Sequence, residues 1–192
     1  MQSARLVEQP KGAGTPPEHA CHFYVEENEL ATTVATFLSP AFVHGHGIVA
    51  IGTPSHLLAI ERRLRTVGHD IDAARTAGQY VPLDAAWALR QLMVGGLPTS
   101  ERFDVVIGTH LERLERAHGG VRAFGEIVNL LWRDGKYQAA LKLEDIWNEV
   151  LGYRPLALVC GYSMGAFREA ARPGLSRVLT THTKVTVQRT AA

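Results

Sequence analysis

The sequence predicts a three-layer α/β domain, with a mostly parallel sheet of about five strands and helices on both faces. Short apolar runs alternate along the chain with amphipathic segments of a dozen or so residues, which is typical of repeated strand–helix–strand units. The short runs are almost continuously apolar, as expected of parallel strands that are covered on both faces. The chain has 192 residues, enough for one full hydrophobic core.

The chain divides into a leader, one domain and a short tail. Residues 1–18 are rich in Gly, Pro and small polar residues without periodicity, which indicates a flexible leader. No linker divides the regular part, so we predict a single domain over residues 19–187 and a tail at 188–192.

Charge and apolar runs exclude several classes of protein. Lys and Arg number 20 against 19 Asp and Glu, and the two signs are intermixed, so we expect no direct contact with nucleic acid. No apolar run approaches the ~20 residues of a membrane helix and no signal pattern precedes the domain, so we expect a cytoplasmic protein with no membrane partner. Cys21 and Cys160 lie in apolar runs and are expected to be buried free thiols.

Three strands are predicted in the first half of the domain. The run Ala20–Val25 is the first, and the helix Glu27–Leu38 follows with acidic residues in its first turn, where the helix dipole favours them. Residues 48–51 and 79–83 are the second and third strands. Helices follow both, one from Pro54 with apolar residues at helical spacing, and one over residues 85–94 behind the N-cap candidate Asp84.

Two further strands are predicted in the second half, at residues 121–125 and 156–160. The first is preceded by an amphipathic helix that includes Phe103 to Leu114 and stops at two glycines. Helical segments then follow at residues 126–132, 137–151 and 164–183. Val185 and Val187 form a brief alternating stretch, which we leave outside the sheet.

Ligands of open parallel sheets bind beyond the carboxyl ends of the strands. The polar and aromatic residues predicted at these ends are Glu26, Glu27, Thr53, His56, Asp84, Glu126, Asn129, Tyr162 and Ser163. Three of the five ends carry carboxylates, which repel phosphate but accept a neutral or cationic small molecule. Helix capping is the alternative role for the acids that begin helices.

Glu126 differs from these acids because packed apolar residues surround it in the sequence. A carboxylate in such a place needs a partner or a raised pKa. Pairing with Arg122 or Arg133 and a role in ligand binding both remain open.

Nucleotide binding by a phosphate-binding loop is excluded at the first strand-to-helix turn. That motif needs glycines and a lysine between strand and helix. The turn instead reads Val25-Glu26-Glu27-Asn28-Glu29-Leu30, with neither.

Three segments together resemble the MEDS domain, a sensory domain of methanogens and methylotrophs named after the dichloromethane-responsive repressor. These are His19–Tyr24, Phe124–Trp132 and Ala140–Asn148, with further agreement at residues 83–85, 160–162 and His182. The resemblance covers about residues 18–187, and the pairing of the second and third segments is its most specific part.

The resemblance implies a RecA/KaiC-like fold with a degenerate ATP site, serving as a non-catalytic sensor of small hydrocarbon derivatives in signal transduction or transcription regulation. It implies no cofactor. The regulatory response to the ligand is then expected to come from a separate output partner, which is a kinase, an anti-sigma factor or a transcription regulator, or from another copy of the chain. By position, the candidate ligand-binding residues are His22, Tyr24, Glu126, Trp132, Glu144, Trp147 and Asn148. A protein-interaction module without a small ligand is the alternative.

Part of this set also follows from helical spacing. In the predicted helix 137–151, Glu144, Trp147 and Asn148 lie three and four residues apart, so a carboxylate, an indole and an amide share one face. A core role for Trp147 and an ion pair for Glu144 is the alternative.

A serine hydrolase is a further alternative, since Gly161-Tyr162-Ser163-Met164-Gly165 has the form of a nucleophile elbow between a strand and a helix. Only Glu169 and His182 follow as partners, and Glu169 is poorly placed to orient the histidine. We expect no catalytic residue.

A metal site is not expected from the nine histidines. Alternation along a strand places His19 and Cys21 on one face and His22 on the other, so these three cannot converge. His44 and His46 offer two ligands, whereas a structural site needs four.

Overall fold

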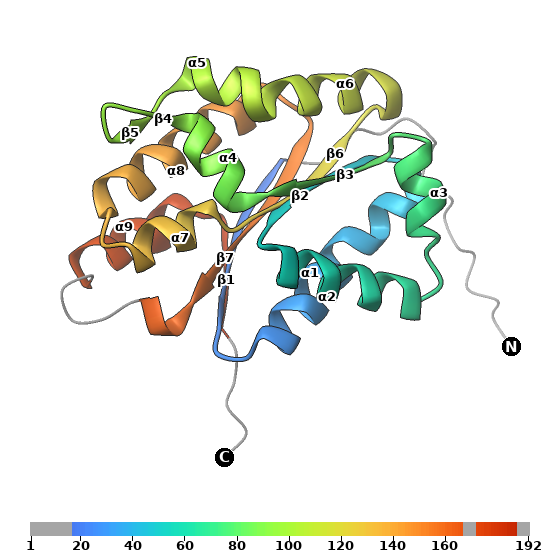
Figure 1. The fold of residues 1–192 in the computed structure, drawn as a ribbon, viewed down its shortest axis with the longest axis horizontal. Helices are drawn as coiled ribbons and strands as arrows, with labels where there is room; N and C mark the ends of the chain where they lie inside the picture. Colours follow the sequence, from blue (N-terminus) through green and yellow to red (C-terminus); the bar gives the residue numbers. More distant parts are fainter. Residues whose placement is uncertain (1–16, 167–171, 188–192) are drawn as a thin grey trace, which may run out of the picture.

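The computed structural model describes residues 17–166 and 172–187 and contains a six-stranded sheet in the order β3-β2-β6-β7-β1-β8 (Figure 1). All neighbouring strands in this sheet are parallel. The strands are β1 (Glu18–Tyr24), β2 (Gly47–Gly52), β3 (Tyr80–Asp84), β6 (Val121–Gly125), β7 (Leu156–Ser163) and β8 (Lys184–Val187). The predicted α/β class with a parallel sheet is therefore confirmed.

Helices cover both faces of the sheet (Figure 1). One face carries α1 (Glu27–His44), α2 (Pro54–Thr66) and α3 (Ile71–Thr76). The other carries α4 (Ala85–Leu92), α5 (Ser100–Phe103), α6 (Thr109–His118), α7 (Ile127–Arg133), α8 (Tyr137–Leu151) and α9 (Arg172–Thr181). Each face has its own buried apolar cluster, because the strand side chains alternate between the two sides.

The sheet has one more strand than predicted. Val185 and Val187, which the sequence analysis left outside the sheet, lie in β8, which pairs with β1 through Cys21 and Val185. β8 is short and largely exposed, so its weak apolar pattern is that of an edge strand. A two-stranded hairpin of β4 (Met93–Val94) and β5 (Leu97–Pro98) was also not predicted.

Several elements extend beyond their predicted limits. α1 continues through Pro40 to His44 and ends at Gly45, whose φ of 71° is left-handed. Burial of Leu38 and Ala41 accounts for this extension. The long amphipathic helix before β6 consists of α5, a π-helical turn at Asp104–Gly108 and α6.

The connections change direction at three places along the carboxyl edge of the sheet, and two of these lie on either side of β6 and β7. The helices after β1 and β2 lie on one face, and those after β6 and β7 lie on the other. β2 is the neighbour of β6, and β7 is the neighbour of β1. Such switch points leave a crevice between the strand ends, where ligands of open α/β sheets bind.

The predicted leader and tail lie mostly outside the described residues. Glu18, which the sequence analysis gave to the leader, is the first residue of β1. Among residues 17–166 and 172–187, every helix is too short or too polar to cross a bilayer.

Candidate functional site at the carboxyl edge of the sheet

Glu126 lies at the switch point between β2 and β6 and is 1% exposed. One of its carboxylate oxygens accepts a hydrogen bond from the backbone N–H of Thr53, which follows β2. A Cβ at Gly52 would lie 3.2 Å from the same oxygen, so glycine allows the carboxylate to approach the end of β2 closely.

His56, in the first turn of α2, is the charged partner of Glu126. Its Nδ1 lies 2.5 Å from Glu126 Oε2. The hydrogen bond to Glu126 raises the pKa of His56 in spite of burial, which favours the imidazolium. Arg122, one of the two arginines expected as possible partners, instead donates to the carbonyl of Phe37 at 3.0 Å.

A second polar bridge spans another switch point, between β7 and β1. Asn129 Nδ2 donates to the hydroxyl of Tyr24 at 3.3 Å, and the backbone N–H of Ser163 donates to Asn129 Oδ1 at 3.0 Å. Burial and the charge of Glu126 raise the pKa of Tyr24, so its hydroxyl stays protonated. The ring of Tyr24 meets that of His56 edge-on at 6.0 Å, which joins the two switch points into one network.

The network reaches solvent at Glu27. Its Oε1 lies 3.7 Å from His56 Nε2, and its side chain is 76% exposed. His56 Nε2 is itself buried and makes no hydrogen bond within the described part of the chain. In the imidazolium form, a ligand that displaces Glu27 would meet an Nε2–H on a ring whose Nδ1 is held by the buried Glu126 carboxylate.

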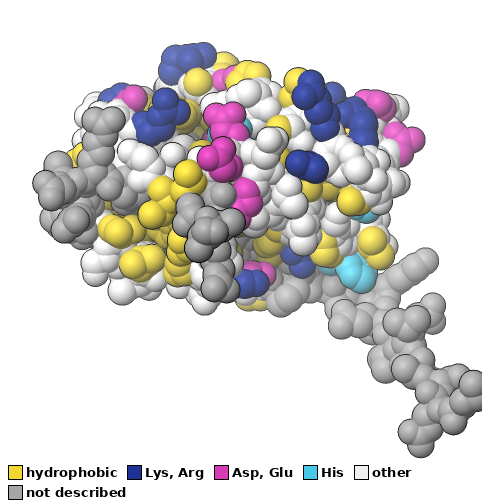
Figure 2. All heavy atoms as spheres, turned by 90° about the horizontal axis from the view of Figure 1, so that it is seen from below, with side chains coloured by type: hydrophobic (Ala, Val, Ile, Leu, Met, Phe, Trp, Pro, Cys, Tyr) yellow, Lys and Arg dark blue, Asp and Glu magenta, His cyan; other side chains and the backbone are white. Residues whose placement is uncertain are grey.

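Hydrophobic and acidic side chains lie side by side on the face toward which β1 and β7 run (Figure 2). Val25, Met164 and Val187 follow or end three adjacent strands and are 49%, 44% and 55% exposed. Two shallow depressions of about 200 and 160 Å³ lie elsewhere, between α1 and α2 on one face of the domain.

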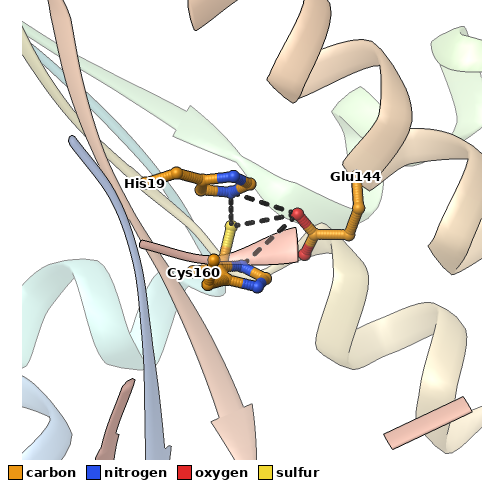
Figure 3. Close-up of side chains that lie close together, drawn as sticks. His19, Glu144 and Cys160 are labelled. Carbon is orange, nitrogen blue, oxygen red and sulfur yellow. Dashed lines mark hydrogen bonds and ion pairs between the residues drawn. The ribbon is translucent and has the colours of Figure 1, made fainter. Parts of the chain in front are cut away.

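Glu144 and Asn148 lie in a different, buried cluster (Figure 3). This cluster is between the sheet and the helices α8 and α9. Glu144 Oε2 lies 3.1 Å from His19 Nε2 and 3.5 Å from His182 Nε2, and Oε1 accepts a hydrogen bond from the Tyr162 hydroxyl. Asn148 Oδ1 lies 2.7 Å from His19 Nδ1. The shared helix face predicted for Glu144 and Asn148 exists, but it points away from the carboxyl edge.

The cluster contains three groups that sequence reasoning did not bring together: His19, Cys160 and His182. Burial opposes ionisation of Glu144, but hydrogen bonds from His19 and Tyr162 hold its pKa below the usual value. Burial and the Glu144 charge raise the pKa of Cys160. The sequence feature that could have indicated this cluster is a histidine and a cysteine, His19 and Cys160, within two apolar strands.

The other predicted site residues are divided between the two cores. Trp147 is 2% exposed and meets Phe103 edge-on at 4.7 Å, and Trp132 packs against Tyr137 at 4.8 Å. His22 points to the opposite face of β1, where its Nδ1 lies 2.9 Å from Thr186 Oγ1. Of the seven predicted residues, only Tyr24 and Glu126 lie at the carboxyl edge.

The geometry does not support the nucleophile-elbow alternative. Ser163 aligns with Tyr24 at the carboxyl end of β1, whereas His182 lies beside His19 near its start. Five residues of strand separate the two levels, roughly 16 Å. The third candidate, Glu169, lies outside the described residues.

Fold and site together define an α/β domain with a KaiC-like fold, in which a buried carboxylate and a histidine meet at the carboxyl ends of β2 and β6. A KaiC-like protein from the hyperthermophilic archaeon Pyrococcus horikoshii OT3 has a similar structure, with a TM-score of 0.58 and 15% sequence identity, over 94% of this chain and 77% of that chain. No protein of curated function matches the sequence.

The chain belongs to the MEDS family, the methanogen/methylotroph, DcmR sensory domain, whose profile matches residues 18–183. The resemblance drawn from the sequence is thereby confirmed.

Proposed function

We propose that this sensory domain is non-catalytic and binds a small organic molecule, of the hydrocarbon-derivative class, at the carboxyl edge beside Glu126 and His56. The observation that carries the proposal is the buried Nε2 of His56, which makes no hydrogen bond in the described chain and has only the exposed carboxylate of Glu27 near it, at 3.7 Å. In the imidazolium form, whose Nδ1 bonds to Glu126, this Nε2–H is suited to an oxygen or halogen acceptor on an otherwise apolar ligand.

The acidic start of α1 supports a ligand without phosphate. Glu26, Glu27 and Glu29 occupy the turn where a nucleotide-binding loop would present backbone N–H groups and a lysine. We expect isothermal titration calorimetry with Mg-ATP to give no binding at micromolar concentration. A one-to-one isotherm would contradict both this and the non-catalytic assignment.

The site is tested by a thermal-shift screen of small organic compounds, including halogenated and one-carbon species. We expect a stabilising compound for the wild type and loss of its effect in Glu126→Gln and His56→Gln. Glu61→Gln is the matched control, because Glu61 is also buried but pairs with Arg75 on the face covered by α2 and α3. A shift that survives Glu126→Gln would place the ligand elsewhere, and equal loss in the control would indicate a general loss of stability.

A protein-interaction module is the second candidate, favoured by the exposed Val25, Met164 and Val187 at the same edge. In that case the output partner, whether a kinase, an anti-sigma factor, a transcription regulator or another copy of the chain, contacts this edge directly. Val187→Asp would then weaken partner capture, while the thermal-shift screen would find no ligand.

A further inference from the structure

Four side chains of metal-ligand type converge under the sheet, and they come from four different elements. His19 is on β1, Cys160 on β7 and Glu144 on α8, while His182 lies in the turn between α9 and β8. All four are buried, and one ligand atom from each lies within 4.8 Å of the other three. Figure 3 shows His19, Cys160 and Glu144 pointing toward a common centre.

Four of the six distances are close to the edges of a coordination tetrahedron, and the other two are within 4.8 Å. Bonds of about 2.0 Å to nitrogen or oxygen and about 2.3 Å to sulfur give edges of about 3.3 Å between nitrogen and oxygen atoms and about 3.5 Å to the sulfur. His19 Nε2 lies 3.1 Å from Glu144 Oε2 and 3.7 Å from Cys160 Sγ. Glu144 Oε2 lies 3.5 Å from His182 Nε2 and 3.9 Å from Cys160 Sγ.

Hydrogen bonds at Nδ1 orient both histidines so that Nε2 is the atom directed into the cluster. His182 Nδ1 lies 2.6 Å from the carbonyl of Val178, which can only accept, so Nδ1 carries the proton. His19 Nδ1 lies 2.7 Å from Asn148 Oδ1 and is held in the same way. This arrangement, with a carbonyl oxygen behind each imidazole, is the usual support of histidine metal ligands.

The Glu144 carboxylate is also oriented so that one of its oxygens can bind a cation. Tyr162 donates to Oε1 of Glu144, which leaves Oε2 for the cluster. Two imidazole nitrogens then face one carboxylate oxygen, and His182 Nε2 makes no hydrogen bond in the described chain. In the metal-free protein a proton on His19 Nε2 bonds to Oε2 of Glu144. A metal ion would replace that proton and take the same three atoms as ligands.

We propose that His19, Glu144, Cys160 and His182 bind one divalent transition-metal ion of the Zn²⁺ type, in a closed structural site. Two imidazoles, a thiolate and a carboxylate in tetrahedral order suit Zn²⁺, and closed four-ligand sites are structural. Cys160 gives up its thiol proton on binding. The ion would fasten the α9–β8 segment, through His182, to β1, β7 and α8.

The first experiment measures metal in the full-length protein. The chain is unfolded with a chelator, refolded with Zn²⁺ or Co²⁺, and freed of loose metal by gel filtration. We expect one ion per chain by elemental analysis, and melting at least about 5 °C higher than for the metal-free protein. Co²⁺ should show the visible absorption of tetrahedral coordination and a near-ultraviolet thiolate-to-metal band.

Variants then assign the ligands. Cys160→Ser should abolish the thiolate band, and His182→Gln should lower the metal content at least tenfold at equal free metal. Cys21→Ser is the matched control, because Cys21 is buried directly opposite Cys160 in the strand register yet is not one of the four groups. His44→Gln controls for loose binding at the surface, since His44 and His46 lie together with ring centroids 5.8 Å apart.

Each outcome of these experiments either supports or overturns the metal site. Stoichiometric metal with a thiolate band that Cys160→Ser removes and Cys21→Ser keeps supports the site. Wild-type protein that refolds without retaining metal overturns it, and so does a Co²⁺ spectrum without the thiolate band, whether or not the variants fold.

Discussion

Two glutamates, Glu126 and Glu144, are each 1% exposed and each contact histidine, but their surroundings differ. Glu126 lies at the edge of the sheet, where His56 links it to the exposed Glu27. Glu144 lies under the sheet among groups that are all buried. The comparison teaches that the route to solvent, rather than burial of the carboxylate, distinguishes a site that can exchange a ligand from one that holds the fold together.

The largest expected effect is on the closed cluster. Glu144→Ala should lower the free energy of unfolding by about 3–5 kcal/mol, because the partner groups are left buried without their acceptor. Glu149→Ala, on the exposed side of the same helix, should stay within about 0.5 kcal/mol of wild type. Urea unfolding followed by circular dichroism measures both. Equal, small effects would show that the cluster is not a stabilising unit.

A smaller effect is expected from Trp147→Phe. The change removes part of the edge-on contact with Phe103 and leaves a small cavity, at a cost of about 1–3 kcal/mol. Since Trp147 lies in the core rather than at the carboxyl edge, ligand-induced thermal shifts should survive. Their loss in a variant that is still folded would move the ligand site toward α8.

At the carboxyl edge, the effect should depend on pH. The pKa of His56 is raised in the folded state, so its pairing with Glu126 contributes full stability below the ordinary pKa of 6.5. That contribution is lost as pH rises through the higher folded pKa. The stability difference between wild type and His56→Gln should therefore shrink from pH 6 toward pH 9 in urea unfolding. A constant difference would mean that the imidazolium is not the stabilised form.

The smallest effect is expected at Glu27. Because its side chain is 76% exposed, Glu27→Gln should change stability by less than about 0.5 kcal/mol. Proton NMR titration should still show a downward displacement of the His56 pKa, smaller than the one caused by Glu126→Gln. The reverse order would mean that Glu27 is the main partner.

The sequence predicted the layers and most strands because those depend on local patterns. Glu144 and Asn148 were placed on one helix face correctly, since their spacing alone decides it. The partner of Glu126 could not be chosen from the sequence, because contact with His56 depends on β2 and β6 being neighbours. The cluster of His19, Cys160 and His182 was missed for the same reason: β1 lies between β7 and β8, and strand order is not a local property.

That position of β1 also bears on synthesis of the chain. The first strand has no sheet neighbour until β7 has been made, and its second neighbour, β8, comes later still. At roughly 5–20 residues per second, the chain between residues 24 and 156 takes about 7 to 26 s to emerge. During that interval the apolar segment Ala20–Tyr24 has no strand to pair with, so nascent chains stalled before residue 156 should be substrates for ribosome-associated chaperones.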